Sequence, residues 1–115
     1  MDDDTLTRAF AALADPTRRD LVSRLTLGDA TVGELAAPYD MSLQAVSKHL
    51  AVLESAGLVS RRRDAQRRPV HLESELLGEL TEWIDRHRRA AEARMSRLDG
   101  VLHHLRSTDP EERTP

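Results

Sequence analysis

Residues 41–59 constrain the fold of this chain most strongly, because their pattern predicts a helix with two unlike faces. Val46, Leu50 and Leu53 recur at helical spacing and are expected to face a core. The opposite, N-terminal side carries uncharged polar side chains and one cation: Ser42, Gln44, Ser47 and Lys48. Hydrogen-bonding groups without negative charge suit a DNA major groove. A solvated helix face explains this segment equally well on its own, so the flanking sequence has to decide.

The flanking sequence on the N-terminal side predicts a helix-turn-helix. An amphipathic helix is expected over residues 5–14, and Asp15-Pro16 ends it and starts the next helix. Thr31-Val32-Gly33-Glu34 forms a capping box that opens a short helix, and Ser42 caps the two-faced helix after it. Two short helices joined by a tight turn make a helix-turn-helix, although Asp40-Met41 stands where such a turn usually carries glycine.

The sequence that follows the two-faced helix predicts a β-hairpin with a basic tip. Apolar and polar residues alternate over residues 58–63 and 69–73, and residues 64–68 separate the two arms. The stretch contains five arginines: Arg61, Arg62, Arg63, Arg67 and Arg68. A hairpin directly after such a helix is the wing of a winged helix. The alternative is a disordered arginine-rich loop.

Residues 74–105 predict one long helix with a seven-residue apolar repeat. The heptad intervals fall on Leu77, Ile84, Ala91, Leu98 and Leu105. Much of a second seam is filled by Leu80, Met95 and Leu102. Such a stripe is typical of a coiled coil, so we expect it to pair with its copy in a second subunit. The alternative is a stripe that packs within one chain.

Size and composition limit the classes of protein. A chain of 115 residues fits one domain, expected over residues 5–105 between an acidic tail at 1–4 and a disordered tail at 106–115. There is no cysteine and no apolar run of membrane-spanning length, and the acidic N-terminus is unlike a signal peptide, so we expect a cytoplasmic protein. No nucleophile-elbow motif or glycine-rich phosphate loop is present, so we expect neither an enzyme nor a cofactor. The net charge of −3 argues against nucleic acid, but the arginines of residues 60–68 form a local basic patch.

Three blocks of the sequence resemble the ArsR/SmtB family of bacterial winged-helix transcriptional regulators. They are residues 12–19 (ALADPTRR), residues 32–36 (VGELA) and residues 42–58, which include Ser47-Lys48-His49-Leu50. The resemblance spans residues 10–105. It implies a mainly α fold with a small β-hairpin, a homodimer formed through the first and last helices, and repression of an operator. The implied dimer contacts, together with the heptad stripe, are Leu6, Phe10, Leu77, Leu80, Trp83, Ile84, Ala91, Met95, Leu98, Leu102 and Leu105.

The chain departs from the metal-sensing members of that family. The thiolate type needs cysteines, and this sequence has none. For the type that uses the last helix, Asp85 and His87 fit the first half of the pattern, but the second half falls on Leu98 and Val101, which cannot bind metal. Two further histidines are adjacent and therefore point apart on a helix: His103 and His104. The chain resembles the metal-independent branch, and we expect no metal site.

The resemblance and the residue chemistry together predict a DNA interface. Gln44 is the expected base-contacting residue, because an amide can form two hydrogen bonds with adenine. Lys48 is expected to reach a phosphate or a guanine, and Ser42 and Ser47 a phosphate or a base. His49 either braces the helix or contacts a phosphate. The other expected contacts are Thr31, which capping explains equally well, and the wing arginines Arg61, Arg62, Arg63, Arg67 and Arg68.

We therefore predict a sequence-specific DNA-binding regulator that acts as a dimeric repressor on an inverted-repeat operator. One alternative is a winged-helix interaction module without sequence specificity. Another is a ligand- or metal-responsive repressor with an unrecognised site. The expected partners are double-stranded DNA and a second copy of the chain. The sequence identifies neither the operator nor an effector.

Overall fold

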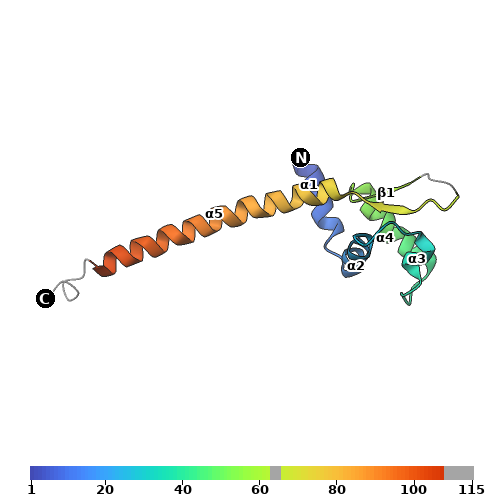
Figure 1. Cartoon of the computed structure of the whole chain (residues 1–115), viewed down its shortest axis with the longest axis horizontal. Helices are drawn as coiled ribbons and strands as arrows, with labels where there is room; N and C mark the ends of the chain where they lie inside the picture. The colour runs from blue at the N-terminus through green and yellow to red at the C-terminus, as the bar shows by residue number, and fades with distance from the viewer. Residues whose placement is uncertain (63–65, 108–115) are drawn as a thin grey trace. The chain divides into compact units, whose positions relative to one another are not determined.

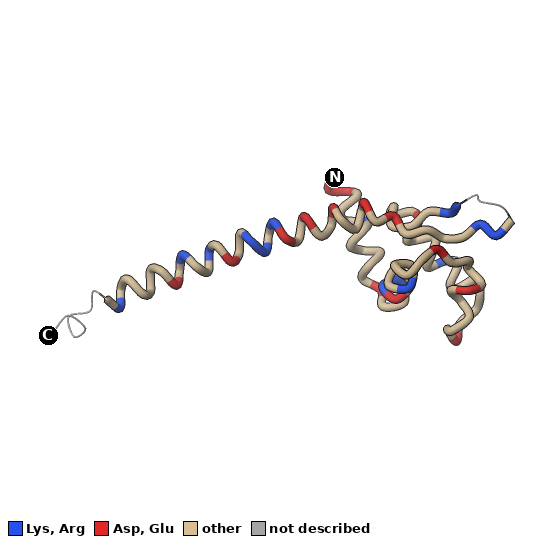
Figure 2. The backbone as a smooth tube through the Cα atoms, viewed as in Figure 1, with Lys and Arg blue, Asp and Glu red and all other residues tan. Residues whose placement is uncertain are grey.

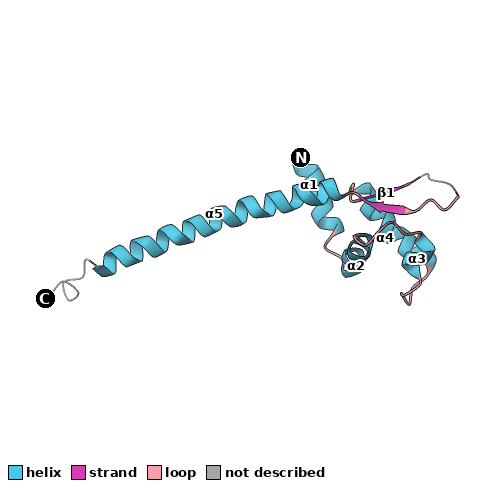
Figure 3. Ribbon diagram, viewed as in Figure 1, coloured by secondary structure: helices cyan, strands magenta, loops and turns pink. Residues whose placement is uncertain are grey.

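The computed structural model describes residues 1–62 and 66–107, which contain five helices and two strands (Figures 1 and 3). In chain order these are α1 (Asp3–Ala12), α2 (Pro16–Leu25), α3 (Val32–Ala36), α4 (Leu43–Ser55), β1 (Val59–Arg61), β2 (Val70–Leu72) and α5 (Ser74–Ser107). The chain divides into two units, Met1–Leu80 and Thr81–Pro115, and α5 is continuous across their boundary. The prediction of a mainly α fold with two antiparallel strands is confirmed.

Side-chain caps fix where the first four helices begin. The capping residues are Asp2, Asp15, Thr31 and Ser42, and the predicted capping box of α3 is present. α1 begins at Asp3 rather than at residue 5, because the Asp2 carboxylate accepts a hydrogen bond of 2.7 Å from the backbone N–H of Thr5. Residues 3 and 4 of the predicted acidic tail are therefore helical. Their carboxylates lie in the first turn, where the helix dipole favours negative charge.

The core of the first unit is aliphatic. Val46, Leu50 and Leu53 of α4 are completely buried, as their helical spacing predicts. They join one cluster with the other buried residues of this unit: Ala9, Ala12, Leu21, Val22, Leu25, Leu35, Ala56, Leu58, Val59, Val70 and Leu80. Burial of one such leucine contributes about 1.5–3 kcal/mol. This packing fixes α4 by one face and leaves the polar face toward solvent.

A left-handed glycine ends α4. The helix stops at Ser55, and Gly57 follows with φ of +83°. The N–H of Gly57 donates to the carbonyl of Glu54 and the N–H of Leu58 to the carbonyl of Leu53, both at 3.0 Å. These two bonds form a Schellman motif, which confirms Gly57 as the helix stop.

The two strands are shorter than predicted. Val59 lies opposite Leu72, and the ladder begins there because the N–H of Leu58 is already bonded within the end of α4. At the other end, the N–H of Arg62 donates to the carbonyl of Pro69 at 2.8 Å, beyond the last assigned pair of strand residues. Residues 63–65 lie outside the described part of the chain, and with them the predicted wing residue Arg63.

A third segment pairs with this small sheet. The N–H of Ala30 donates to the carbonyl of Val70 at 3.2 Å, and the N–H of Val70 donates to the carbonyl of Ala30 at 2.7 Å. This bridge connects the loop before α3 to β2. The wing is thereby joined at its base to the helix-turn-helix, a contact that the sequence pattern did not predict.

The heptad stripe divides at Leu80. Leu80 is only 3% exposed and belongs to the core of the first unit, so it offers almost no surface for the predicted contact with a second subunit. Five later stripe residues of α5 are each 49–60% exposed: Ile84, Met95, Leu98, Leu102 and Leu105. Ala91 is also exposed. These six side chains retain apolar surface that another chain could cover.

α5 extends beyond its predicted end. It continues to Ser107, so residues 106 and 107 of the predicted tail are helical, whereas residues 108–115 lie outside the described part of the chain. Among the helices of residues 1–62 and 66–107, none combines the length and the apolar character of a membrane span.

Candidate DNA interface

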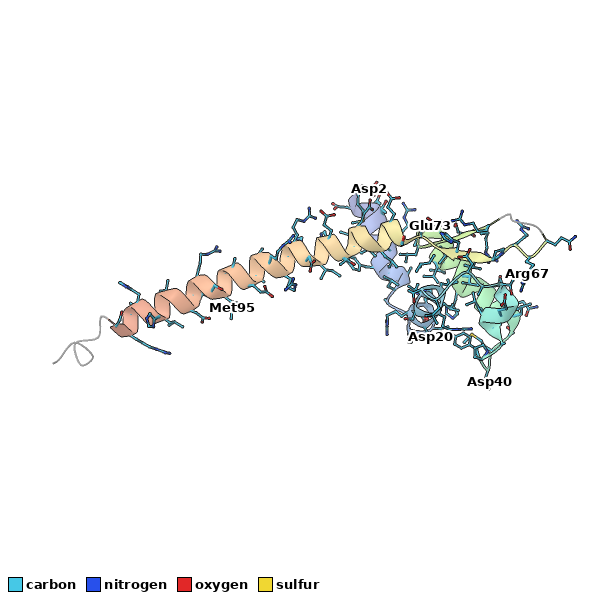
Figure 4. All side chains as sticks on the ribbon, viewed as in Figure 1. Asp2, Asp20, Asp40, Arg67, Glu73 and Met95 are labelled. Carbon is cyan, nitrogen blue, oxygen red and sulfur yellow. The ribbon has the colours of Figure 1, made fainter. Side chains whose placement is uncertain are left out.

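The turn between α3 and α4 is held by side chains from α2. Tyr39 donates a hydrogen bond to the carboxylate of Asp20, which is labelled in Figure 4. The guanidinium of Arg24 lies 5.4 Å from the centre of the Tyr39 ring and donates to the carbonyls of Leu35 at 2.6 Å and Glu34 at 3.1 Å. Burial, followed by the hydrogen bond to Asp20, raises the pKa of Tyr39. These contacts hold the short helix α3 and its turn in position. No residue of the turn, residues 37–42, has a positive φ, so glycine is not needed there.

Four predicted contact residues lie on or just before the N-terminal half of α4: Ser42, Gln44, Ser47 and Lys48. Gln44 and Lys48 are exposed, and Ser47 is half-buried. The hydroxyl of Ser42 accepts a hydrogen bond of 3.1 Å from the N–H of Ala45 and so starts the helix. Gln44 and Ser47 also line an open groove together with apolar side chains of α3 and α4. The polar face is thus accessible, and its amide and ammonium groups point to solvent-accessible space.

His49 lies apart from this polar face. Its Nδ1 is 3.4 Å from Nη1 of Arg18 and 3.8 Å from Oδ2 of Asp15, at the junction of α1 and α2. Of the two roles predicted for His49, this position favours bracing of the helix over contact with a phosphate.

The wing arginines occupy different environments (Figure 2, blue segments before and after residues 63–65). Arg62, Arg67 and Arg68 are exposed. Arg61 is half-buried, and its Nε is buried without a hydrogen-bond partner among the described residues. Arg67, labelled in Figure 4, forms an ion pair of 3.1 Å with Glu34 of α3. The wing thus presents several cations, one of which, Arg67, is paired with an acid of the helix-turn-helix.

Glu34, which the sequence places in the capping box, also contacts the wing. Its Oε1 accepts hydrogen bonds from the N–H of Thr31 at 3.1 Å, the hydroxyl of Thr31 at 2.9 Å and Nη2 of Arg67 at 3.1 Å. The Thr31 hydroxyl in turn accepts from the N–H of Glu34 at 3.2 Å. The bonds from Thr31, and to a lesser extent the charge of Arg67, lower the pKa of Glu34. Thr31 therefore serves as the predicted cap, with its hydroxyl hydrogen donated to Glu34.

The two residues that matched half of a metal pattern have other partners. Asp85 forms an ion pair with Arg88 at 3.2 Å. Nδ1 of His87 is 2.8 Å from the carbonyl of Trp83, and the two rings stack with their centres 4.1 Å apart. Across residues 1–62 and 66–107, no three His, Asp or Glu side chains lie together in a way that could hold a metal ion.

Comparisons with known proteins agree with this geometry. Residues 13–62 match a family described as a helix-turn-helix domain. The HTH-type transcriptional regulator Rv2034 of Mycobacterium tuberculosis is 47% identical over 79 residues, covering 69% of this chain and 74% of that protein. The transcriptional repressor SdpR of Bacillus subtilis is 32% identical over 79 residues, covering 69% of this chain and 88% of that protein. The crystal structure of an ArsR family transcriptional regulator, 38% identical, aligns with a TM-score of 0.70 over 76% of this chain and 97% of that one.

Proposed function

Because this chain belongs to the ArsR/SmtB family of winged helix-turn-helix transcriptional regulators, we propose that it acts as a homodimeric repressor that binds an inverted-repeat operator. The similar proteins are named transcriptional regulators or a transcriptional repressor, so the proposal is regulation of transcription and not an enzymatic activity. One observation carries the proposal: α4 is anchored in the core by one face, exposes Gln44 and Lys48 on the other, and is followed by an arginine-bearing hairpin. A cytoplasmic location, where the chromosome is accessible, belongs to the same proposal.

DNA recognition is assigned to two kinds of contact. Gln44 would enter the major groove and bond a base edge, with Ser47 and Lys48 beside it. Ser42 and Thr31, at the N-termini of α4 and α3, would lie near phosphates, where the helix dipoles favour negative charge. The wing arginines would supply affinity without sequence preference: Arg61, Arg62, Arg63, Arg67 and Arg68.

A second copy of the chain is the proposed partner of the exposed stripe on α5. The stripe residues Ile84, Ala91, Met95, Leu98, Leu102 and Leu105 recur at coiled-coil spacing, and five of them retain about half of their surface exposed. Leu6, Phe10, Leu77 and Trp83 complete the proposed interface, from which Leu80 is removed. Two-fold pairing would place the two copies of Gln44 in two DNA half-sites whose centres are one helical turn (~34 Å) apart.

Selection from a pool of duplexes with randomised bases tests this function on the full chain. The enriched duplex and a scrambled duplex of the same composition are then compared by fluorescence anisotropy at fixed salt. We expect the enriched sequence to be an inverted repeat and to bind at least about 10³-fold more tightly. Equal binding of both duplexes, with steep salt dependence, would identify a winged-helix module without sequence specificity.

A further inference from the structure

The carboxylate of Glu34 joins the wing to the start of α3. One oxygen, Oε1, accepts the N–H and the hydroxyl of Thr31 and also Nη2 of Arg67, all within 3.1 Å. Thr31 and Arg67 are separated in sequence and belong to different elements. Both are residues that the proposed function places against DNA phosphates. In the DNA-free protein, their donors already bind a protein anion.

We propose that Glu34 is an internal competitor of the DNA backbone for Arg67. Its carboxylate holds the wing against α3 when DNA is absent, and a DNA phosphate must replace it before Arg67 can contribute to binding. Glu34 would therefore position the wing and at the same time reduce the affinity for all DNA sequences. This inference rests on the proposed function in placing the wing along the DNA.

The electrostatics of the pair suit an exchange of partners. Hydrogen bonds from Thr31 and the charge of Arg67 lower the pKa of Glu34, so its carboxylate is ionised throughout the neutral range. The side chains of Arg67 and Glu34 are 73% and 55% exposed. An ion pair exposed to that degree is weak and screened by salt, so a phosphate of a highly charged duplex can displace the carboxylate. A buried pair would instead resist the exchange.

The capping box allows the charge of Glu34 to be removed without removing its structural role. Glutamine at the third helical position can still accept a hydrogen bond from the N–H of the capping residue. Glu34→Gln should therefore preserve the start of α3 while it weakens the attraction for Arg67. Glu79, an exposed acid on α5, supplies a matched control, because Glu79→Gln changes the net charge by the same amount at another place.

A double-mutant cycle on DNA binding tests the competition. Full-length wild type, E34Q, R67A and the E34Q/R67A double variant are titrated at low salt against a fluorescein-labelled duplex of random sequence. We expect E34Q to bind about two- to fivefold more tightly than wild type, the range expected for release of one exposed ion pair. In the R67A background, E34Q should give no gain, and E79Q should differ little from wild type. Unchanged or weaker binding by E34Q would overturn the proposal, as would an equal gain with and without Arg67, which would indicate direct repulsion of DNA.

A measurement without DNA separates this inference from the proposed function. Nitrogen-15 NMR of the arginine guanidinium groups reports how freely the Nη groups of Arg67 rotate. We expect slower rotation in wild type than in E34Q, because the ion pair holds Nη2. Identical signals in the two proteins would show that the pair is absent in solution and would overturn the inference, even if specific DNA binding had been demonstrated. Conversely, slowed rotation in a protein that shows no sequence preference would leave the contact standing and count against the proposed function alone.

Discussion

His49 of α4 reaches across to Arg18 of α2, with Nδ1 of the imidazole 3.4 Å from Nη1 of the guanidinium. The same guanidinium donates through Nε to the carbonyl of Ala12 at 2.7 Å, where α1 ends. Asp15, which caps α2, lies 3.8 Å from His49 Nδ1. His49 thus connects the proposed recognition helix, α4, to the corner between α1 and α2.

Removal of the His49 imidazole should therefore lower the free energy of unfolding rather than remove a DNA contact. We expect His49→Ala to lower the free energy of unfolding by about 1 kcal/mol, the usual contribution of one hydrogen bond. Lys48→Ala, one residue earlier on the exposed face, should change it by less than about 0.5 kcal/mol. Urea unfolding of the DNA-free proteins makes the comparison. Unchanged stability in His49→Ala, combined with weaker DNA binding, would favour the phosphate contact instead.

Acid pH should weaken the corner through Asp15. A hydrogen bond from the N–H of Arg18, and next the charge of His49, lower the pKa of the Asp15 carboxyl below its ordinary 3.8. A lowered pKa means that the ionised carboxylate stabilises the fold above that ordinary value, and that this stabilisation disappears as the pH falls through the lower, folded pKa. Asp15→Asn keeps a capping side chain but does not titrate.

The test is urea unfolding of wild type and Asp15→Asn in the range of about pH 7 to pH 2. We expect wild type to be the more stable protein at neutral pH and its advantage to shrink below about pH 4. Asp2 and Glu34, whose pKa values are also lowered, are present in both proteins, so the difference isolates Asp15. An advantage that stayed constant to the acid limit would contradict the assignment.

Glycine is required at position 57 but not at position 78. Gly57 has φ of +83°, and a Cβ there would lie 3.4 Å from Cδ2 of Leu76. Gly57→Ala should therefore destabilise the protein by about 1 kcal/mol or more. A Cβ on Gly78, within α5, meets nothing within 4 Å, so Gly78→Ala should stabilise the helix by up to about 1 kcal/mol. Thermal unfolding should show a lower melting temperature for Gly57→Ala and a higher one for Gly78→Ala. Shifts of both variants in the same direction would contradict this difference between the two glycines.

Local signals explain why most of the fold was predictable. A cap needs only a side chain and an N–H three residues later, so the starts of α2, α3 and α4 follow from Asp15, Thr31 and Ser42. The buried face of α4 follows from the spacing of its apolar residues, which is also a local signal. The single bridge between Ala30 and Val70 leaves no such pattern, because one paired residue shows no alternation.

The contacts of the arginines could not be derived in this way. Arg24 bonds carbonyls ten and eleven residues away, and Arg67 reaches a carboxylate 33 residues away. A guanidinium has five donors on a long side chain, so its partner depends on the assembled fold. Leu80 illustrates the same limit for apolar residues: helical spacing places it on an apolar face, but core contacts and subunit contacts use the same residue types.

The two kinds of proposed DNA contact should separate in binding experiments. Gln44→Ala is expected to reduce the preference for the enriched duplex over the scrambled one by about 1–3 kcal/mol, because base contacts carry the discrimination. Arg67→Ala should weaken both duplexes alike and reduce the salt slope by about one. Anisotropy titrations at several salt concentrations provide both quantities. An equal loss of discrimination in the two variants would contradict the division into base and phosphate contacts.

The exposed stripe on α5 should determine the oligomeric state. Leu98 is 49% exposed, and Leu98→Asp would place two carboxylates in the proposed seam, where burial of charge opposes pairing. Ser96, exposed on the same helix, supplies the control, because Ser96→Asp adds the same charge two residues from Leu98 and outside the heptad stripe. In sedimentation velocity, we expect wild type and Ser96→Asp to be dimers and Leu98→Asp to be a monomer that retains its helical circular dichroism. Since a monomer offers one recognition helix, Leu98→Asp should also lose most of its affinity for the inverted repeat. A dimer that survives Leu98→Asp would show that the stripe is not the interface.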